Sequence, residues 1–271
     1  MKNERSSVKK RLRVVGFVQA RMTSSRLPGK VLMDLVGKPV VQRIIQRLQA
    51  AREVDETVLM ITTQKEDDQL AALGEHLGVS VYRSENERLL DGYHDLAHAY
   101  SADAIVCITC DCPFVDPDHV DVLVKVFREK PDAYDLVTNV LPSTWPDGLD
   151  IFVYPTAILD YFYAHRDSMY QYPVTFNFSK NPKQYRVYNQ KNDTDLSPLR
   201  WTLDYPEDLE LVRKVYAALF PKKFLFKTPD ILQLIKEHPE LMDINANRAD
   251  PTHGWGDNIK AFLDTSRKKA A

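Results

Sequence analysis

The segment of the sequence best suited to chemistry is a basic loop at residues 21–30, Arg-Met-Thr-Ser-Ser-Arg-Leu-Pro-Gly-Lys. It carries three basic side chains, Arg21, Arg26 and Lys30, which we expect solvent to reach. Gly29 allows backbone N–H groups to approach a ligand closely, and this combination binds phosphate groups. The loop lacks the first glycine of the P-loop pattern and does not match the dinucleotide fingerprint. We expect it to bind a triphosphate; the alternative is a solvated basic loop.

Two aspartates, Asp111 and Asp204, each follow a segment predicted to be a buried strand. If both strands end at one edge of one sheet, the two carboxylates can share a Mg²⁺ ion. Proteins hold this ion through one or two carboxylates together with substrate phosphates. The alternatives are structural: Asp204 caps the helix predicted to begin at Pro206, and Asp111 is a turn residue.

The three cysteines, Cys107, Cys110 and Cys112, are closely spaced but complete neither a disulfide framework nor a metal site. Their number is odd, and a tetrahedral zinc site needs a second ligand pair that the sequence does not supply. His94 and His98 have i, i+4 spacing on a predicted helix, and they too stand alone in the sequence. We interpret the thiols as buried or loop cysteines and the histidines as surface or capping residues.

Composition and charge exclude several classes of protein. The 271 residues carry a formal net charge of -2 with a pI near 6.4, so general binding to nucleic acid or to a membrane is not expected. No apolar run approaches the roughly 20 residues of a membrane span, and the charged first residues do not resemble a signal peptide. We expect a cytoplasmic protein that binds small molecules.

A sheet must position these residues, because short apolar runs alternate with amphipathic segments along the first half of the chain. Such alternation predicts an α/β fold with a mostly parallel sheet, helices on both faces and a ligand site beyond the carboxyl ends of the strands. The predicted helices are a segment from Pro39, residues 66–77 and 88–100, and a segment from Asp116. The predicted strands are residues 14–18, 57–62, 79–82, 104–109 and 136–140.

The second half of the chain is predicted to complete this domain. Residues 141–198 are rich in Pro, Tyr and Asn, and we expect an insertion of strands and loops that completes a substrate pocket or pairs subunits. Residues 199–203 are predicted to form a strand, followed by a helix from Pro206 and another at 228–237. The predicted domain boundaries give a flexible tail at 1–12, one domain at 13–245 and a C-terminal tail at 246–271.

Four motifs stand out along the chain: Val18-Gln-Ala-Arg-Met-Thr-Ser-Ser-Arg-Leu-Pro-Gly-Lys30, Asp111-Cys-Pro113, Trp145-Pro-Asp-Gly-Leu-Asp150 and Leu199-Arg-Trp-Thr-Leu-Asp-Tyr-Pro-Glu-Asp-Leu209. They resemble the motifs of one enzyme family, the cytidylyltransferases of spore-coat polysaccharide biosynthesis. These enzymes are related to the acylneuraminate and 3-deoxy-manno-octulosonate (KDO) cytidylyltransferases. The motifs occur in the order expected for this family and cover almost all of residues 13–245.

The resemblance implies a Rossmann-like, GT-A-like nucleotidyltransferase that uses CTP and Mg²⁺. It would couple CMP to an acidic sugar or another anionic acceptor, with release of pyrophosphate, in surface polysaccharide or glycoconjugate biosynthesis. A homodimer paired through the 141–198 insertion is also implied. The implied catalytic residues are Arg21, Lys30, Asp111 and Asp204, of which Asp111 and Asp204 would bind the metal. The implied binding residues are Asp147 and Asp150 for the acceptor, and Ala20, Arg21, Ser25, Arg26, Gly29 and Lys30 for the nucleotide.

Several positions depart from the family's pattern. The family usually has Arg at the position of Cys107, Gly at that of Cys110 and an acidic residue at that of Phe152. Its Glu-His before Val-Thr is here Tyr172-Pro173. These changes fall where the acceptor or the base is expected, so the resemblance does not identify the acceptor.

Two other functions fit the same residues. A GT-A-like glycosyltransferase would consume a nucleotide-sugar and use Asp111 on its metal, and it would release no pyrophosphate. A degenerate nucleotide-binding protein would bind CTP and metal without turnover.

Overall fold

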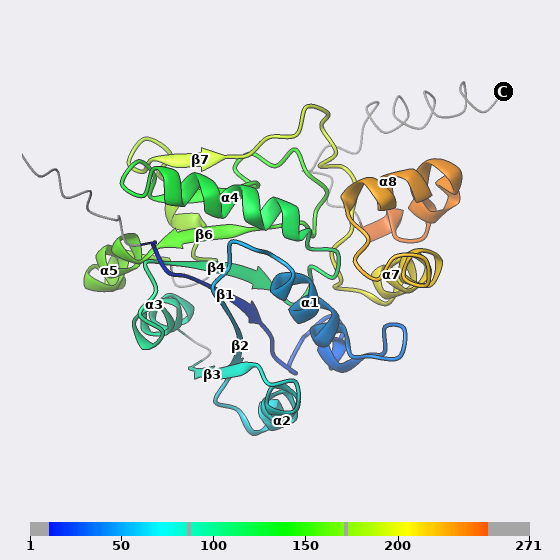
Figure 1. Cartoon of the computed structure of the whole chain (residues 1–271), viewed down its shortest axis with the longest axis horizontal. Coiled ribbons are helices and arrows are strands. Elements are labelled where there is room, and N and C mark those ends of the chain that lie inside the picture. The colour runs from blue at the N-terminus through cyan, green and yellow to red at the C-terminus, as the bar shows by residue number, and fades with distance from the viewer. Residues whose placement is uncertain (1–10, 86–87, 171–172, 249–271) are drawn as a thin grey trace, which may run out of the picture.

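The computed structural model describes residues 11–85, 88–170 and 173–248, which build a seven-stranded sheet with helices on both faces (Figure 1). Most of the predicted tails at 1–12 and 246–271 lies outside the described residues. Residues 246–248 are anchored, because Arg248 pairs with Glu207 at 3.0 Å and lies over the Tyr205 ring. The strands are β1 Val14–Gln19, β2 Glu56–Thr62, β3 Ser80–Ser84, β4 Ala104–Thr109, β5 Leu136–Thr138, β6 Phe152–Pro155 and β7 Val187–Asn189.

The sheet is mostly parallel, as predicted. Its strand order is β3-β2-β1-β4-β6-β5-β7, and only β6 runs antiparallel to its neighbours. β1 and β4 are central and pair with each other, with Val14 opposite Ala104 and Gln19 opposite Thr109. Both strands are buried apart from that last residue, which explains their continuous apolar sequence. Their carboxyl ends therefore lie side by side.

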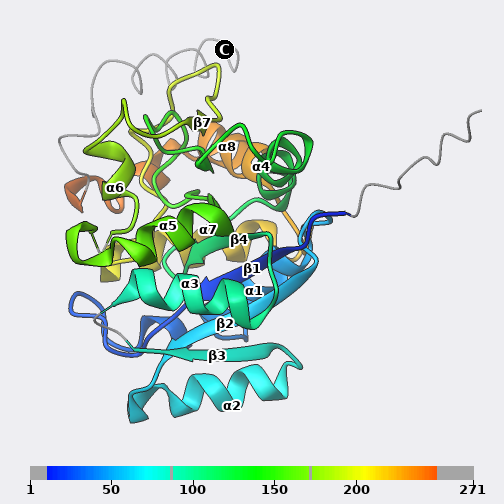
Figure 2. The ribbon, with the colours of Figure 1, turned by 90° about the vertical axis from the view of Figure 1, so that its left-hand side faces the viewer.

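Helices cover both faces of the sheet. α1, α4, α7 and α8 pack on the face that contains Val18 and Val106, and α3 and α5 pack on the opposite face, with Phe17 and Ile105. Figure 2 shows α3 and α5 in front of the strands and α2 beside β3. The helices are α1 Val40–Gln49, α2 Asp68–His76, α3 Leu89–Ala99, α4 Pro117–Glu129, α5 Thr156–Ala164, α6 Phe176–Ser179, α7 Pro206–Leu219 and α8 Thr228–Glu237.

The elements predicted for the first half of the chain are confirmed, with ends shifted by at most two residues. Local chemistry explains two of the helix starts. Asp116 is the N-cap of α4 and accepts a hydrogen bond from the Asp118 N–H at 3.0 Å, with Pro117 in the first turn. Pro39 is the N-cap of α1 and not its predicted first residue.

The prediction of a strand at 199–203 is wrong. This extended segment makes one isolated bridge, between Asp147 and Arg200, and no strand of the sheet. Its backbone bonds to two loops instead: the Trp201 N–H donates to the Asp147 carbonyl at 2.7 Å, and the Leu203 N–H donates to the Asp111 carbonyl at 2.8 Å. Its apolar residues are buried, so their alternation with polar residues reflects contact with the core and not pairing with a neighbouring strand.

The 141–198 insertion is more regular than predicted. It contains β6, which lies between β4 and β5, and the helix α5, which packs on α3. Residues 152–155 therefore belong to the sheet itself, and Phe152 pairs in register with Cys107 of β4. The insertion is part of the core and not an addition to it.

Gly148 allows the loop 146–150 to lie directly against the segment 199–203. Its φ is 100°, and a Cβ added there would lie 2.6 Å from the Trp201 carbonyl carbon and closer still to the Thr202 nitrogen. Only glycine fits such a backbone approach. The loop that carries Asp147 and Asp150 is thereby held beside the segment that leads to Asp204.

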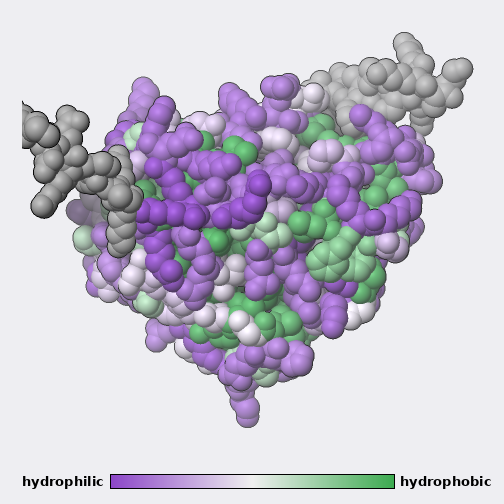
Figure 3. Space-filling view, in the orientation of Figure 1, coloured by the Kyte–Doolittle hydropathy of each residue, from purple (hydrophilic) through white to green (hydrophobic). Residues whose placement is uncertain are grey.

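No helix among the described residues combines the length and the apolar character needed to cross a bilayer. The face in Figure 3 is mostly hydrophilic, with apolar areas scattered in small groups.

Replacement of Gly148 tests the close approach of these two segments. Gly148→Ala combines strained backbone with overlap against backbone atoms, so it should lower the free energy of unfolding by at least about 3 kcal/mol. Gly37→Ala is the matched control, because Gly37 also has positive φ (74°) but no atom within 4 Å of an added Cβ. We expect it to cost about 1 kcal/mol. Urea denaturation measures both, and equal losses would contradict the proposed packing.

Candidate active site

Two adjoining cavities lie at the carboxyl edge of the sheet, where β1 and β4 end. One has a volume of about 220 Å³ and contains the basic side chains of loop 21–30; we call it the basic cavity. The other, of about 310 Å³, contains Asp147 and Asp150; we call it the acidic cavity. Four residues form their common border: Gln19, Thr109, Asp111 and Asp204.

The basic cavity contains the residues implied for nucleotide binding, except Gly29. Gly29 has φ 70°, and its N–H donates to the Met22 carbonyl at 3.0 Å. The glycine therefore closes the loop, and its own N–H is engaged within the loop. The implied residues that line the basic cavity are Ala20, Arg21, Ser25, Arg26 and Lys30.

The loop is attached to β2 through the buried carboxylate of Asp67. This carboxylate accepts hydrogen bonds from the Met22 N–H at 2.7 Å and from the Thr62 N–H at 2.9 Å. Leu27 and Val31 anchor the other end of the loop in the core. The basic side chains thus project from a loop that is anchored at both ends.

Lys30 lies between the two aspartates that the sequence predicts to converge. Its ammonium is 3.0 Å from the Asp204 carboxylate and 3.7 Å from that of Asp111. The side chain is only 10% exposed, so the expectation of a solvent-reachable lysine is wrong. Burial disfavours the charged form, but the charges of Asp111 and Asp204 outweigh it and raise the pKa of Lys30.

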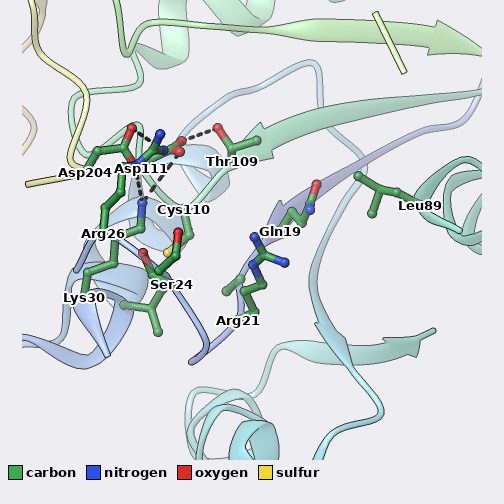
Figure 4. A pocket seen from close by; sticks show the side chains of 13 residues that line it. Gln19, Arg21, Ser24, Arg26, Lys30, Leu89, Thr109, Cys110, Asp111 and Asp204 are labelled. Carbon is green, nitrogen blue, oxygen red and sulfur yellow. Dashed lines mark hydrogen bonds and ion pairs between the residues drawn. The ribbon is translucent and has the colours of Figure 1, made fainter. Parts of the chain in front are cut away.

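Arg21 and Arg26 differ in their pairing. Arg26 contacts the Asp204 carboxylate at 2.7 Å. Arg21 is exposed and makes no ion pair with any described residue. In Figure 4, Arg26 and Lys30 point toward the aspartates, and Arg21 lies near Gln19 on the other side of the cavity. Arg21 is therefore available to an anionic ligand.

Asp204 is aimed at the cavity by a buried network and does not cap α7, which contradicts the structural alternative. The N-cap is Tyr205, and the Asp208 carboxylate accepts from the N–H groups of Asp204 and Tyr205, both at 2.9 Å. Asp208 is fully buried and also receives two hydrogen bonds from Arg200, at 2.9 and 2.8 Å. Burial favours the neutral form of Asp204, but the positive charges of Lys30 and Arg26 outweigh this effect and lower the pKa of Asp204.

The border between the cavities suits a hard cation. Asp111 and Asp204 supply carboxylate oxygens, the ligands that Mg²⁺ prefers. The Lys30 ammonium already occupies the space between them, so both carboxylates are directed toward one positive charge. The residues present therefore fit the metal that the family implies.

The acidic cavity contains both aspartates of the loop 146–150. Asp147 contacts Arg200 at 3.2 Å. Asp150 is surrounded differently: desolvation raises its pKa most, and the charges of Asp147 and Asp111 raise it further, to about 8. The hydrogen bond from the Gly148 backbone only partly opposes this rise. Asp150 is thus a carboxyl group that lacks a compensating positive charge.

The three cysteines are buried and free, which agrees with their interpretation as structural thiols. Burial raises the pKa of each thiol, so none is a thiolate nucleophile near neutral pH. Two departures from the family's pattern are structurally paired, because Cys107 and Phe152 are partners in register and both line the acidic cavity. Pro173 also lines it, and Tyr172 lies outside the described residues.

His94 and His98 have a partner that the sequence did not indicate. Their Nε2 atoms lie 3.4 and 2.7 Å from the carboxylate of Asp160, on α5. The ligand atoms lie within 4.8 Å of one another, close enough to share a small cation. None of these residues lines either cavity, so the cluster links α3 to α5 away from the candidate site.

Sequence reasoning missed several residues that line the cavities. Gln19 and Thr109 are the last residues of β1 and β4, and a polar residue at the carboxyl end of a parallel strand is a usable signal. Tyr93 and Tyr154 gave no such signal, because α3 and β6 meet the cavity only through the folded topology. Arg200 and Thr202 belong to a motif that the sequence analysis identified, but no role in the site was predicted for them.

The fold and this edge of the sheet define a class of enzyme. A mostly parallel, Rossmann-like sheet with a basic loop after its first strand and carboxylates beside it is the arrangement of a nucleotidyltransferase. A family model described as cytidylyltransferase matches residues 15–218. The chain therefore belongs to the cytidylyltransferase family.

Three relatives illustrate the range of similarity. The chain is 28% identical to the spore coat polysaccharide biosynthesis protein SpsF of Bacillus subtilis, over 84% of this chain and 95% of that protein. It is 34% identical to the mitochondrial 3-deoxy-manno-octulosonate cytidylyltransferase of Arabidopsis thaliana, over 53% of this chain and 49% of the relative. The structure of a cytidylyltransferase from Leptospira borgpetersenii superposes with a TM-score of 0.80 at 26% identity, over 85% of this chain and 97% of that one.

The raised pKa of Asp150 predicts a pH-dependent effect of Asp150→Asn on stability. From the ordinary carboxyl pKa near 4 up to about 8, the unfolded chain ionises Asp150 and the folded protein does not. Wild-type stability should therefore fall across this range, and the variant should lack that contribution. We expect the melting temperature of Asp150→Asn to rise relative to wild type from pH 5 to pH 8, in EDTA without nucleotide.

The matched control is Asp167→Asn, because Asp167 is fully exposed and lies outside both cavities. Its melting temperature should follow that of the wild type at every pH. A constant difference between Asp150→Asn and wild type would show that Asp150 titrates normally.

Proposed function

We propose that this chain transfers CMP from CTP to an acidic sugar or a related anionic acceptor and releases pyrophosphate, in the synthesis of a surface polysaccharide or glycoconjugate. The observation that carries the proposal is the arrangement of Arg21, Lys30, Asp111 and Asp204 around one cavity that adjoins a second one. The names of the spore-coat and KDO relatives support both the nucleotide and the acceptor class.

The basic cavity would hold the triphosphate. Arg21 is the described basic residue of the loop without a carboxylate partner, so a phosphate can bind it without breaking an ion pair. Arg26 and Lys30 are paired with Asp204 and would exchange that contact for phosphate oxygens. Ala20 and Ser25 would line the same site.

Asp111 and Asp204 would hold Mg²⁺ at the border of the cavities. The bound ion supplies charge neutralisation for the phosphates. The Thr109 hydroxyl donates a hydrogen bond to the Asp111 carboxylate, and Asp208 fixes the backbone of Asp204. These contacts keep both carboxylates oriented toward the border.

The reaction that fits this arrangement is in-line displacement at the α-phosphorus. An acceptor oxygen in the acidic cavity would form the new bond as the bond to the β-phosphate oxygen breaks, and the hydroxyl proton would pass to solvent. Such chemistry depends on positioning and on neutralisation of charge. Arg21 and Lys30 would offset the charge that develops on the pyrophosphate.

Arg21→Ala tests the triphosphate site. The side chain is exposed and makes no ion pair with a described residue, so its removal should leave the melting temperature unchanged. A charged contact made mainly in the transition state is worth about 3 kcal/mol, which corresponds to a fall of about 100-fold in kcat. Steady-state pyrophosphate release measures this. A variant with wild-type turnover would mean that the loop is merely solvated.

Asp111→Asn and Asp204→Asn test the metal site. Asparagine keeps the size of the side chain but removes the charge that a hard cation needs, so each variant should lose at least about 100-fold in Mg²⁺-dependent turnover. Asp111→Asn should keep its stability. Asp204→Asn should lose about 1–3 kcal/mol, because Lys30 loses the charge of its nearest partner. Activity and melting temperature are measured together across a magnesium titration, with Asp167→Asn as control; full activity in both variants would overturn the mechanism.

A pyrophosphate-release screen separates the remaining functions. It crosses four nucleoside triphosphates with a panel of sugar acids and phosphonates. CTP-dependent release supports the proposal. A glycosyltransferase would produce none and would consume a nucleotide-sugar, and a degenerate protein would bind CTP and metal without any turnover.

A further inference from the structure

The charge of the acidic cavity does not match an acceptor that is only an anion. Its described lining contains four carboxylates, those of Asp111, Asp147, Asp150 and Asp204, and one basic side chain, Arg200. Asp111 and Asp204 lie at the border with the basic cavity. Beyond the border, the charged groups that face the acceptor are therefore Asp147, Asp150 and Arg200.

Arg200 is already engaged and is poorly placed to receive an acceptor carboxylate. Its Nε and one terminal nitrogen donate to Asp208 at 2.9 and 2.8 Å, and its other terminal nitrogen donates to Asp147 at 3.2 Å. The side chain is 9% exposed. An anion that binds Arg200 would have to displace the carboxylate of Asp147 or that of Asp208.

Asp150 is a carboxyl group without a cationic partner in the part of the chain that the structure describes, and a cationic ligand would supply one and favour its ionised form. The described charges that act on it are those of Asp147 and Asp111, and the Gly148 backbone donates a hydrogen bond to it. The described residues of this cavity do not bring three potential metal ligands together. Among the described residues, three ligand atoms of His, Cys, Asp or Glu come within 4.8 Å only in the cluster of His94, His98 and Asp160, which lies elsewhere.

Aromatic rings line the same cavity. Tyr93, Phe152 and Tyr154 are all part of its lining. The Tyr93 and Tyr154 ring centres are 5.8 Å apart, and those of Phe152 and Tyr154 are 6.1 Å apart. Aromatic faces attract cations, and rings combined with carboxylates are the typical surroundings of a bound ammonium group.

We infer that the acceptor carries a protonated amine, which binds in the acidic cavity against Asp150 and the rings of Tyr93, Phe152 and Tyr154. The inference rests on the proposed function and narrows its acceptor to an amino sugar acid. The acid group of such a molecule would face the border, near Lys30 and the metal, and its ammonium would face the acidic cavity. The two cavities would thus recognise the two opposite charges of one substrate.

The test compares acceptors that differ in one group. The series consists of 3-deoxy-manno-octulosonate and derivatives in which one hydroxyl at a time is replaced by an amine, each with its N-acetylated counterpart. Binding is measured by calorimetry with Mg²⁺ and a CTP analogue that has a methylene group between the α- and β-phosphorus atoms. Turnover is measured separately, as pyrophosphate release with CTP.

At least one amine should bind at least tenfold more tightly than both the parent compound and its own N-acetylated form. In Asp150→Asn, the loss of affinity should be at least tenfold larger for that amine than for the parent compound. Phe152→Leu should weaken the amine selectively but by less, because it removes one ring and keeps an apolar side chain. The control Asp167→Asn should retain the full preference.

The possible outcomes separate this inference from the proposed function. Pyrophosphate release with no amine bound more tightly than the parent would overturn the inference and leave the proposed function intact. An amine preference that depends on Asp150, without pyrophosphate release, would support the cavity assignment and overturn the proposed reaction. Neither preference nor release would overturn both. Because the wild-type preference is measured directly, the test does not depend on the folding of any variant.

Discussion

The candidate site depends on one buried ion pair, that between Arg200 and Asp208. Asp208 is fully buried, yet its two oxygens receive donors from the Arg200 side chain, from the Asn245 amide and from the backbone of Asp204 and Tyr205. Removal of either partner would leave a buried charge without its counterion, which is among the costliest changes that a protein interior can undergo. The pair determines where α7 begins and where Asp204 points. The remaining nitrogen of Arg200 donates a hydrogen bond to Asp147. The same ion pair therefore supports both the border between the cavities and the acidic cavity.

The topology of the sheet places unlike environments side by side. β1 leads directly into the basic loop, whereas β6 returns antiparallel beside β4 and brings the loop 146–150 to the same edge. One end of the site is therefore rich in positive charge and the other in carboxylates and aromatic rings, with Asp111 and Asp204 between them. Two substrates can bind next to each other along this edge, so that the reacting group of each lies in a different electrostatic environment.

The sequence predicted what depends on short-range patterns. The apolar runs of β1 to β4 and the amphipathic helices between them were identified almost to the residue, and the rule for parallel sheets placed the basic loop and Asp111 at one edge. The segment 199–203 was predicted to form a strand, although its backbone bonds to two loops and not to a strand. Burial of Lys30, the proton affinity of Asp150 and the contact of Asp160 with the two histidines depend on residues far away in the chain. Local spacing carries no information about them.

The position of Lys30 has a consequence for the order in which ligands enter. An ammonium group that lies between Asp111 and Asp204 acts as a built-in counterion, so under the proposed function a free divalent cation would have to compete with it for the same oxygens. A triphosphate in the basic cavity would offer the ammonium an alternative anion, and the carboxylates would then be available to the metal. Nucleotide and cation would thus strengthen each other's binding, and thermodynamic linkage makes that coupling equal in both directions. On this view Lys30 couples the two ligands, because each of them would bind strongly only when the other is also bound.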